Sequence, residues 1–367
     1  MKIGIMSMQR IINYGSFLQA YGLKRVIEDL GHDVQFVDYR TEKSLVKNEA
    51  QIHMNKLIRV IKMLSPKYRS WRRKQIKLNS TFTDFIRVFK KEYLPMLGMA
   101  PELNYSPELD VLVVGSDEVF NCTQSGCEVG YSKQLFGEEQ NAKKIISYAA
   151  SFGNTTYEKL KDYNIDREVG TYLHNFNALS VRDNNSSEII KTLIDVLPKK
   201  HIDPVLLYGF PEVNDISIEL KDYIVVYAYA DRITEEESRQ IRAFAKKHDK
   251  KIVSLGFYQP FCDMWIQASP FEVLAYIKHA DYIITDTFHG AVFSIKYQKK
   301  FGVIIRDSNR QKLQDLLKEF NVQDRQILDL YNLGVVVEKE LNSSDICKRI
   351  KENQIKAMDY LSYNLSI

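Results

Sequence analysis

Residues 281–290 read DYIITDTFHG and run directly into AVFSI at residues 291–295. The first apolar run predicts a buried parallel strand, and the second predicts a helix that begins near Ala291. The polar residues between them therefore fall at a strand-to-helix turn. Open α/β sheets bind their ligands at such turns. This stretch predicts an α/β fold and places a candidate site within it.

Gly290 and His289 suggest that this turn binds an anion. A glycine lets the backbone approach a ligand closely, and a helix that begins near Ala291 directs its unpaired N–H groups toward an anion. A histidine there donates to a phosphate or carboxylate when charged, or exchanges a proton near neutral pH. In the alternative interpretation His289 is structural, capping the helix or bonding to a neighbouring carbonyl. The stretch alone leaves both interpretations open.

The composition indicates a globular protein with more than one domain. Its 367 residues fit two domains of roughly 150 residues each. A chain that is 45% hydrophobic and 27% charged is not of the disordered class. The net charge of +4 is too small to argue for a nucleic-acid partner.

The cysteines and the apolar runs predict where the protein resides. Cys122, Cys127, Cys262 and Cys347 are scattered and lack the paired spacing of a metal finger, so we expect free thiols and no metal. Residues 1–6 resemble the start of a strand rather than a secretion signal. No apolar run approaches the roughly 20 residues of a membrane span. We therefore expect a cytoplasmic protein.

The N-terminal part of the chain predicts a Rossmann-like domain over residues 1–207. Lys2–Met6 is typical of a strand, Ser16–Leu30 of a helix capped by Ser16 and ended by Gly31, and Val34–Tyr39 of a second strand. Together they make a β-α-β unit. Further strands are predicted at residues 110–114, 144–150 and 178–183.

A basic insertion interrupts this domain at about residues 44–82. No acidic residue occurs between Glu49 and Asp84, whereas apolar residues from Met54 to Leu64 recur at helical spacing. The segment fits a helix packed on the domain with a solvated basic side. It also fits a basic amphipathic helix on the anionic inner face of a membrane. Nucleic acid is disfavoured because no aromatic stacking pattern accompanies the charge.

Small and polar residues follow three of these strands at their carboxyl ends. In a parallel sheet such ends share one edge, so Gly115, Ser116, Ser151 and Arg182 are expected to converge.

Residues 208–340 predict a second Rossmann-like domain that carries His289. Its strands are expected at residues 223–229, 251–255 and 301–305, beside the strand of the opening stretch. Thr234 with Glu237, and Ser269 with Glu272, form two capping boxes that begin helices. Residues 309–320 predict another helix. A terminal helix is expected within residues 341–367.

Several separated blocks of the chain resemble the polysaccharide pyruvyl transferase family. They occur in the family's order across about residues 1–305. The blocks are Asn13–Tyr21, Val114–Asp117, Ser180–Asp183, Asp203-Pro204 and Thr285–Gly290.

The resemblance implies a fold, a reaction and two substrates. The fold would be two Rossmann-like domains facing a cleft, as in the glycosyltransferase B fold. The reaction would transfer the enolpyruvyl group of phosphoenolpyruvate, the donor substrate, to two sugar hydroxyls and form a pyruvate ketal, without a further cofactor. The acceptor would be a surface-polysaccharide or teichoic-type sugar, often on a membrane lipid carrier. On that basis the basic insertion is a candidate contact with the membrane or an anionic carrier.

The resemblance also suggests roles for individual residues. Arg182 would hold the donor's carboxylate or phosphate, unless it forms a surface salt bridge with Asp183 or Glu188. His289 would contact the leaving phosphate or protonate the donor's methylene carbon. Asp117 would activate an acceptor hydroxyl, unless its role is a buried hydrogen bond. The other implied positions are Gly115, Ser116, Thr287 and Gly290 for the donor, and Asn13 and Tyr14 for the acceptor.

Thr287 departs from the pattern of many family members, which carry an arginine at that position. A threonine donates one hydrogen bond and supplies no charge. The missing cation must then come from elsewhere, and Arg306 and Lys296 are the candidates.

Two other classes of function fit the same chain. One is a glycosyltransferase of the same two-domain class that uses a nucleotide sugar. The other is a non-catalytic scaffold or sugar-binding subunit of a polysaccharide assembly complex.

Overall fold

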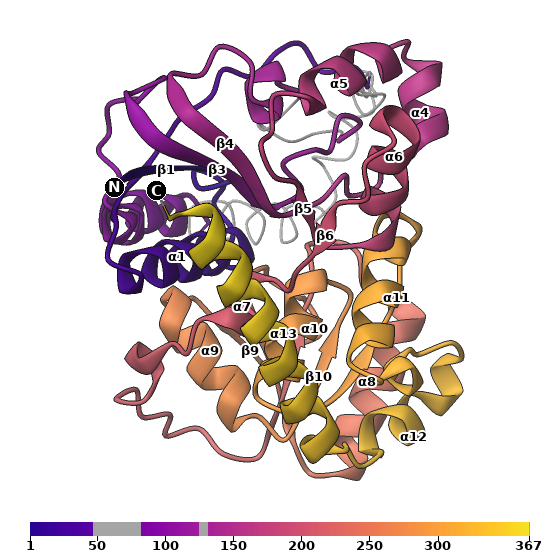
Figure 1. Ribbon diagram of the computed structural model, residues 1–367. Helices are drawn as coiled ribbons and strands as arrows, with labels where there is room; N and C mark the ends of the chain where they lie inside the picture. The colour runs from indigo at the N-terminus through magenta and orange to yellow at the C-terminus, as the bar shows by residue number, and fades with distance from the viewer. Residues whose placement is uncertain (47–81, 125–130, 367) are drawn as a thin grey trace, which may run out of the picture.

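The computed structural model describes residues 1–46, 82–124 and 131–366 and contains two parallel α/β units (Figure 1). The upper unit in Figure 1 holds the N-terminal strands, and the lower unit holds the second sheet. The expected α/β architecture of two Rossmann-like units is confirmed. The basic insertion expected at residues 44–82 lies almost wholly outside the described residues.

The first sheet has six strands in the order β2-β1-β3-β4-β5-β6, all parallel. The chain order reverses between β1 and β3, which are neighbours. The strands are β1 Lys2–Met6, β2 Asp33–Phe36, β3 Leu109–Asp117, β4 Ala142–Ala150, β5 Ser180–Val181 and β6 Lys199–Lys200. Its helices are α1 Tyr14–Asp29, α4 Tyr157–Asp162, α5 Asp166–Leu173, α6 Asn184–Ile194 and α7 Pro204–Leu207.

The second sheet has five parallel strands in the order β11-β10-β7-β8-β9, and its order reverses between β7 and β10. Its strands are β7 Tyr223–Tyr227, β8 Lys251–Leu255, β9 Met264–Ile266, β10 Tyr282–Thr285 and β11 Lys300–Val303. Its helices are α8 Glu235–Lys247, α9 Pro270–His279, α10 Phe288–Lys296, α11 Arg310–Glu319 and α12 Leu333–Glu338. Both expected capping boxes are present, at the starts of α8 and α9.

Two helix starts differ from the sequence expectation. Helix α1 is capped by Asn13, whose Oδ1 accepts the N–H of Gly15 at 2.7 Å, rather than by Ser16. Helix α10 begins at Phe288 instead of near Ala291, because Thr287 caps it through the N–H of Gly290 at 2.9 Å. In each case a polar residue upstream competes successfully for the first free amides. Both helices therefore begin earlier and closer to the strand that precedes them.

The terminal helix α13, Ser343–Asn364, joins the two units. In Figure 1 it runs from the lower unit to the upper one, so the two termini lie close together. Its Tyr360 hydroxyl donates to the carbonyl of Ser147 in β4 at 2.9 Å, and Lys144 donates to the carbonyl of Asn364 at 2.7 Å. The helix therefore fastens the end of the chain to the first sheet.

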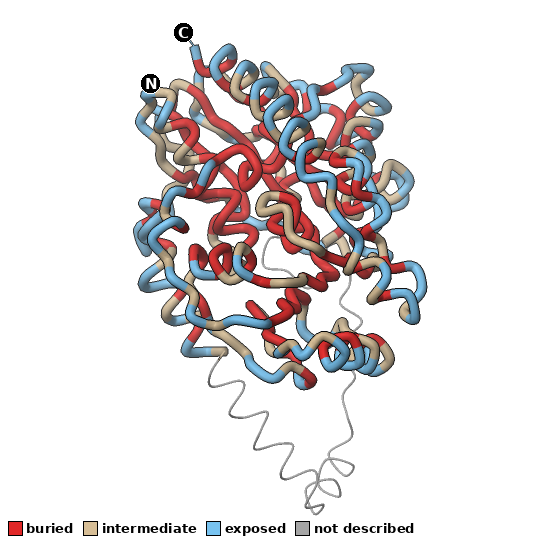
Figure 2. Tube along the Cα trace, turned by 90° about the horizontal axis from the view of Figure 1, so that it is seen from below, coloured by how far each residue is buried: buried red, intermediate tan, exposed pale blue. Residues whose placement is uncertain are grey.

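The buried residues are concentrated in the two sheets (Figure 2). The strands and the inner faces of their helices are buried, and the outer faces of α8, α11 and α13 are exposed. In the described part of the chain, no helix has both the length and the apolar character that a membrane span requires.

We expect Gly290→Ala to destabilise the protein by about 3 kcal/mol, because overpacking a tight contact forces backbone shifts. A Cβ at position 290 would lie 2.1 Å from Thr285 Oγ1 and 2.8 Å from Thr285 Cβ. Gly170 in α5 is the matched control, because a Cβ there meets its first neighbour at 3.6 Å. Chemical denaturation should show the loss in Gly290→Ala only, and an equal loss in Gly170→Ala would contradict the steric explanation.

Candidate active site

A polar cleft of about 450 Å³ lies between the two sheets, at the edge where both have their reversal of strand order. Open α/β sheets bind ligands at the carboxyl ends of strands at such points. The lining comes from loops after β1, β3, β4, β7 and β11 and from the start of α10. Its charged and histidine side chains are Asp117, Glu118, Arg232, His289 and Lys312.

His289 enters this cleft from the first turn of α10. Its side chain is buried against Gly15 of α1, where a Cβ would lie only 2.2 Å from His289 Nδ1. A glycine is therefore required at position 15 for the ring to occupy this place. The expected strand-end block around Asn13 and the block around His289 thus meet across the two units.

The Nε2 atom of His289 lies 3.5 Å from Asp203 Oδ2. This separation allows charge attraction, but the geometry is not that of a hydrogen bond, and Nε2 has no hydrogen-bond partner among the described residues. A buried polar atom without a partner is unusual and costs free energy in the absence of a ligand. The atom is itself buried against Asp203, which does not line the cleft, so the cleft is lined by other atoms of His289.

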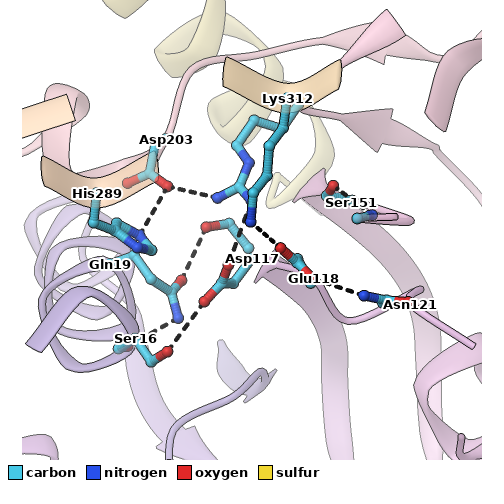
Figure 3. A network of polar contacts seen from close by, with 12 residues as sticks. Ser16, Gln19, Asp117, Glu118, Asn121, Ser151, Asp203, His289 and Lys312 are labelled. Atoms are coloured by element: carbon cyan, nitrogen blue, oxygen red, sulfur yellow. Dashed lines mark hydrogen bonds and ion pairs between the residues drawn. The ribbon is translucent and has the colours of Figure 1, made fainter. Parts of the chain in front are cut away.

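A buried chain of charges connects the two units behind His289 (Figure 3). The Arg182 guanidinium donates to Asp203 Oδ2 at 2.9 Å and to Asp117 Oδ1 at 3.3 Å. It also lies 4.0 Å from the centre of the Phe288 ring in the second unit. Arg182 thus pairs with neither Asp183 nor Glu188, and it does not line the cleft itself. Its expected contact with the donor stays a prediction.

Asp203 is the most buried member of this chain of charges. Burial alone would raise its pKa, but the contacts with His289 and Arg182 outweigh burial and hold the pKa below its ordinary value. The same side chain caps α7 by accepting the N–H of Val205 at 3.0 Å. Asp203 is therefore ionised at neutral pH and sets the charge beside His289.

Asp117 lines the cleft and is held from two sides. The Ser16 hydroxyl donates to its Oδ2 at 3.1 Å, opposite the contact from Arg182. Ser116, by contrast, is fully buried and donates to Gln19 Oε1 at 2.9 Å. A Cβ at Gly115 would lie 2.2 Å from the carbonyl oxygen of Tyr148, inside the sheet. Neither Gly115 nor Ser116 lines the cleft, although both belong to the strand that presents Asp117.

Glu118 and Lys312 form an ion pair across the cleft, from β3 to α11 (Figure 3). Burial would raise the pKa of Glu118, but Lys312 outweighs it and keeps the pKa below its ordinary value. Asn121 also donates to Glu118 at 2.7 Å. The sequence analysis missed Glu118 and Lys312. Lys312 lies within a helix and no motif marks it, whereas Glu118 directly follows Asp117 at a strand end.

The expected donor contacts at positions 287 and 290 are engaged within the helix cap. Thr287 accepts the N–H of Gly290 and faces a smaller apolar pocket beside the cleft. The first-turn amides that remain without an intrahelical partner are those of Phe288 and His289. At this end of α10, the N–H groups left for an anion are therefore those of Phe288 and His289, and not that of Gly290.

Asn13 and Tyr14 lie where the cleft joins the apolar pocket. Asn13 lines both cavities, and its Nδ2 lies 3.4 Å from the Tyr229 hydroxyl of the second unit. Tyr14 lines only the apolar pocket, and its hydroxyl donates to the carbonyl of Ala268 at 2.6 Å. The pocket wall is aromatic, consisting of Tyr14, Phe82, Phe85, Tyr227, Tyr229 and Phe257.

Arg306 and Lys296, the candidates for the cation absent at Thr287, do not line the cleft. Arg306 donates to both carboxylate oxygens of Glu237 at 2.7 and 2.9 Å. Lys296 donates to the carbonyl of Tyr208 at 2.7 Å, and burial lowers its pKa to about 8. The cleft instead receives Arg232, which the sequence analysis also missed because it follows β7 without a motif.

The described residues hold no group of three His, Cys, Asp or Glu side chains arranged to bind a metal ion. Cys122, Cys262 and Cys347 are free, and Cys127 lies outside the described residues.

Comparison with known proteins supports both the expected family and the fold. The family model described as polysaccharide pyruvyl transferase matches residues 13–308. UGT89C1 of Arabidopsis thaliana, solved with UDP-L-rhamnose, aligns over 98% of both chains at 11% identity and a TM-score of 0.51. UDP-GlcNAc 2-epimerase from Methanocaldococcus jannaschii aligns over 99% of this chain and 100% of its own, at 13% identity and a TM-score of 0.49. Comparison with curated proteins finds no significant match.

We expect Asp203→Asn to lower the free energy of unfolding by about 3 kcal/mol, because it leaves the buried charge of Arg182 less compensated. Asp203 has a lowered pKa, so its contribution is present at neutral pH and is lost as pH falls through the folded-state pKa. The difference from the parent protein should therefore close below about pH 4. Denaturation at several pH values measures it.

Asp329→Asn is the control for this substitution. Asp329 is an exposed cap that accepts the N–H of Tyr331 at 3.0 Å and has no buried cationic partner in the described ranges. Asparagine caps about as well as aspartate. A loss at position 329 as large as that at position 203 would show that capping, not charge, explains the result.

Proposed function

Because the chain belongs to the polysaccharide pyruvyl transferase family, we propose that it transfers the enolpyruvyl group of phosphoenolpyruvate to a sugar of a polysaccharide or of its lipid-linked precursor. Two hydroxyls of that sugar would close a pyruvate ketal, and phosphate would leave. The observation that carries this proposal is the cleft itself, in which His289 lies together with two cations, Arg232 and Lys312, and the carboxylates of Asp117 and Glu118.

The proton balance of this reaction explains why an acid and a base are needed together. The methylene carbon of the donor gains one proton and becomes a methyl group, and the two acceptor hydroxyls lose one proton each. One of these two protons balances the proton added to the methylene carbon, and the other leaves with the phosphate as HPO₄²⁻. The reaction therefore moves protons from the acceptor to the donor without net uptake.

His289 is our candidate for the group that moves a proton. Its side chain lines the cleft, and it is the only imidazole among the described lining residues. Its Nε2 is buried 3.5 Å from Asp203, whose carboxylate orients the ring. Asp117 and Glu118 lie in the same cleft and can accept hydrogen bonds from the acceptor hydroxyls.

The aromatic pocket at Asn13 and Tyr14 is our candidate for the acceptor side. The pocket encloses only about 30 Å³, so a sugar ring would pack across its aromatic mouth and not inside it. Aromatic rings offer apolar area with few rotatable bonds, which suits the apolar face of a sugar ring. Asn13 lines both cavities and could bind a hydroxyl between them. A lipid-linked acceptor and a contact of the basic insertion with an anionic membrane remain part of this proposal.

Incubation of the protein with phosphoenolpyruvate and lipid-linked oligosaccharides should yield a pyruvyl ketal and free phosphate, detected by mass spectrometry and a phosphate assay. Phosphoenolpyruvate should also raise the melting temperature. At one hundred times its Kd, binding adds about 2.7 kcal/mol to the free energy of unfolding. Stabilisation by a nucleotide diphosphate with none by phosphoenolpyruvate would favour a nucleotide-sugar glycosyltransferase instead.

His289→Gln distinguishes an enzyme from a scaffold. If the protein is an enzyme, His289→Gln should lower turnover about 100-fold or more, the range typical of a general acid–base group. A scaffold would keep its contribution to polysaccharide assembly in this variant.

Gly15→Ala tests whether the position of His289 matters. The added Cβ requires the ring to move, and a displacement of about 1 Å can cost roughly 100-fold in rate. The same clash should also cost stability, as at Gly290, so the unfolding midpoint is measured with the kinetics to confirm that the variant is folded. Steady-state kinetics with Gly170→Ala as control measures the effect, and unchanged turnover would remove His289 from the chemistry.

A further inference from the structure

One cation of the cleft forms no ion pair among the described residues. Lys312 is paired with Glu118, and His289 lies against Asp203. Arg232 lines the same cleft and forms no ion pair with a carboxylate of the described ranges, although its charge acts on the buried Asp286. Its guanidinium carbon lies 4.5 Å from the centre of the Tyr229 ring, a contact that orients the group without neutralising it.

The backbone that carries Arg232 is held in place by Arg306. Arg306 donates to the carbonyl of Arg232 at 2.8 Å while both its terminal nitrogens bind Glu237. Glu237 is in turn held by the capping box of α8, in which it is the third helical residue and pairs with Thr234. Arg306 therefore positions the loop after β7. Of these two arginines, only Arg232 forms no ion pair among the described residues.

Arg232 also lies at the reversal point of the second sheet, on the same side as the start of α10. The loop after β7 is tied to the turn after β10, because the N–H of Tyr229 donates to Asp286 Oδ1 at 3.3 Å. The start of α10, at Phe288 and His289, lines the same cleft. A guanidinium and a helix N-terminus are complementary to a phosphate.

We propose that Arg232 binds the phosphate of the donor and supplies the cation that Thr287 does not. The assignment rests on the proposed function for the identity of the donor. Phosphoenolpyruvate carries charge on both a phosphate and a carboxylate, whereas Lys312 and Arg182 are already bound to carboxylates of the protein. The phosphate therefore binds beside the guanidinium that is not held in an ion pair, between Arg232 and the start of α10.

Calorimetric titration of the full-length protein at constant ionic strength tests this assignment. The ligands are phosphoenolpyruvate, inorganic phosphate and pyruvate, so that the two ends of the donor are measured separately. Arg232→Gln should weaken the first two about 10- to 100-fold, as expected for a lost charge-assisted contact, and leave pyruvate unchanged. The phosphate affinity of Arg232→Lys should lie between those of the parent and of Arg232→Gln, because lysine keeps the charge and loses the planar fork.

Arg310→Gln is the matched control. Arg310 is the first residue of α11, pairs with Asp307 at 2.6 Å and does not line the cleft. Its removal changes the net charge equally, so phosphate affinity should stay within about twofold, because exposed charges at a distance are screened by salt. An equal loss in Arg310→Gln would overturn a direct contact and indicate a general field effect.

The other outcomes separate this assignment from the proposed function. If Arg232→Gln binds phosphate as tightly as the parent, or weakens pyruvate in place of phosphate, the assignment is wrong while the pyruvyl donor stands. If the parent binds inorganic phosphate through Arg232 but does not bind phosphoenolpyruvate, the anion site stands and the proposed donor is wrong. Unfolding midpoints of all variants check that the fold is intact.

Discussion

The buried contact of Arg182 with Asp117 and Asp203 is the interaction on which the rest of the site depends. It joins the ends of β3 and β5 to the start of α7, and the guanidinium packs on Phe288 of the second unit. A buried charge is costly unless it is paired and hydrogen-bonded. All three of these groups belong to the first unit, and the second unit adds the Phe288 ring on the guanidinium and His289 beside Asp203. The same charged group thus satisfies the buried cation and contacts the second unit.

The meeting of the two units also explains why the candidate histidine occupies its place. His289 packs on Gly15 of the first unit, Lys312 reaches Glu118, and helix α13 returns from the second unit to the first sheet. The first two of these contacts involve residues that line the cleft. The cleft is therefore a product of the domain interface, because its lining residues come from both units.

Charge within the cleft is nearly balanced by the protein itself, and this balance determines where a ligand with negative charge can bind. Glu118 neutralises Lys312, and Asp203 lies beside His289. Arg306 is committed to Glu237 and supports the loop that presents Arg232. The candidates that sequence reasoning suggested for the missing cation, Arg306 and Lys296, are structural for this reason. A guanidinium is free to bind a ligand only where its surroundings leave it without a carboxylate.

The sequence by itself determined most of the strands, the turn at His289 and the family, because these depend on local patterns. Short apolar runs, two capping boxes and polar strand ends predicted all strands of the two sheets except the short β6 and β9. Asn13, Asp117 and His289 do line one cleft, as the shared edge of parallel strands requires; their roles remain predictions. Only the tertiary structure decided which of the other polar residues face the cleft. The Ser116 side chain is buried beside Gln19, and Arg182 forms buried ion pairs. Lys312 and Arg232 line the cleft although no sequence motif marks them. The physical reason is that a charged side chain is directed by partners far away in sequence, and a local pattern contains no information about them.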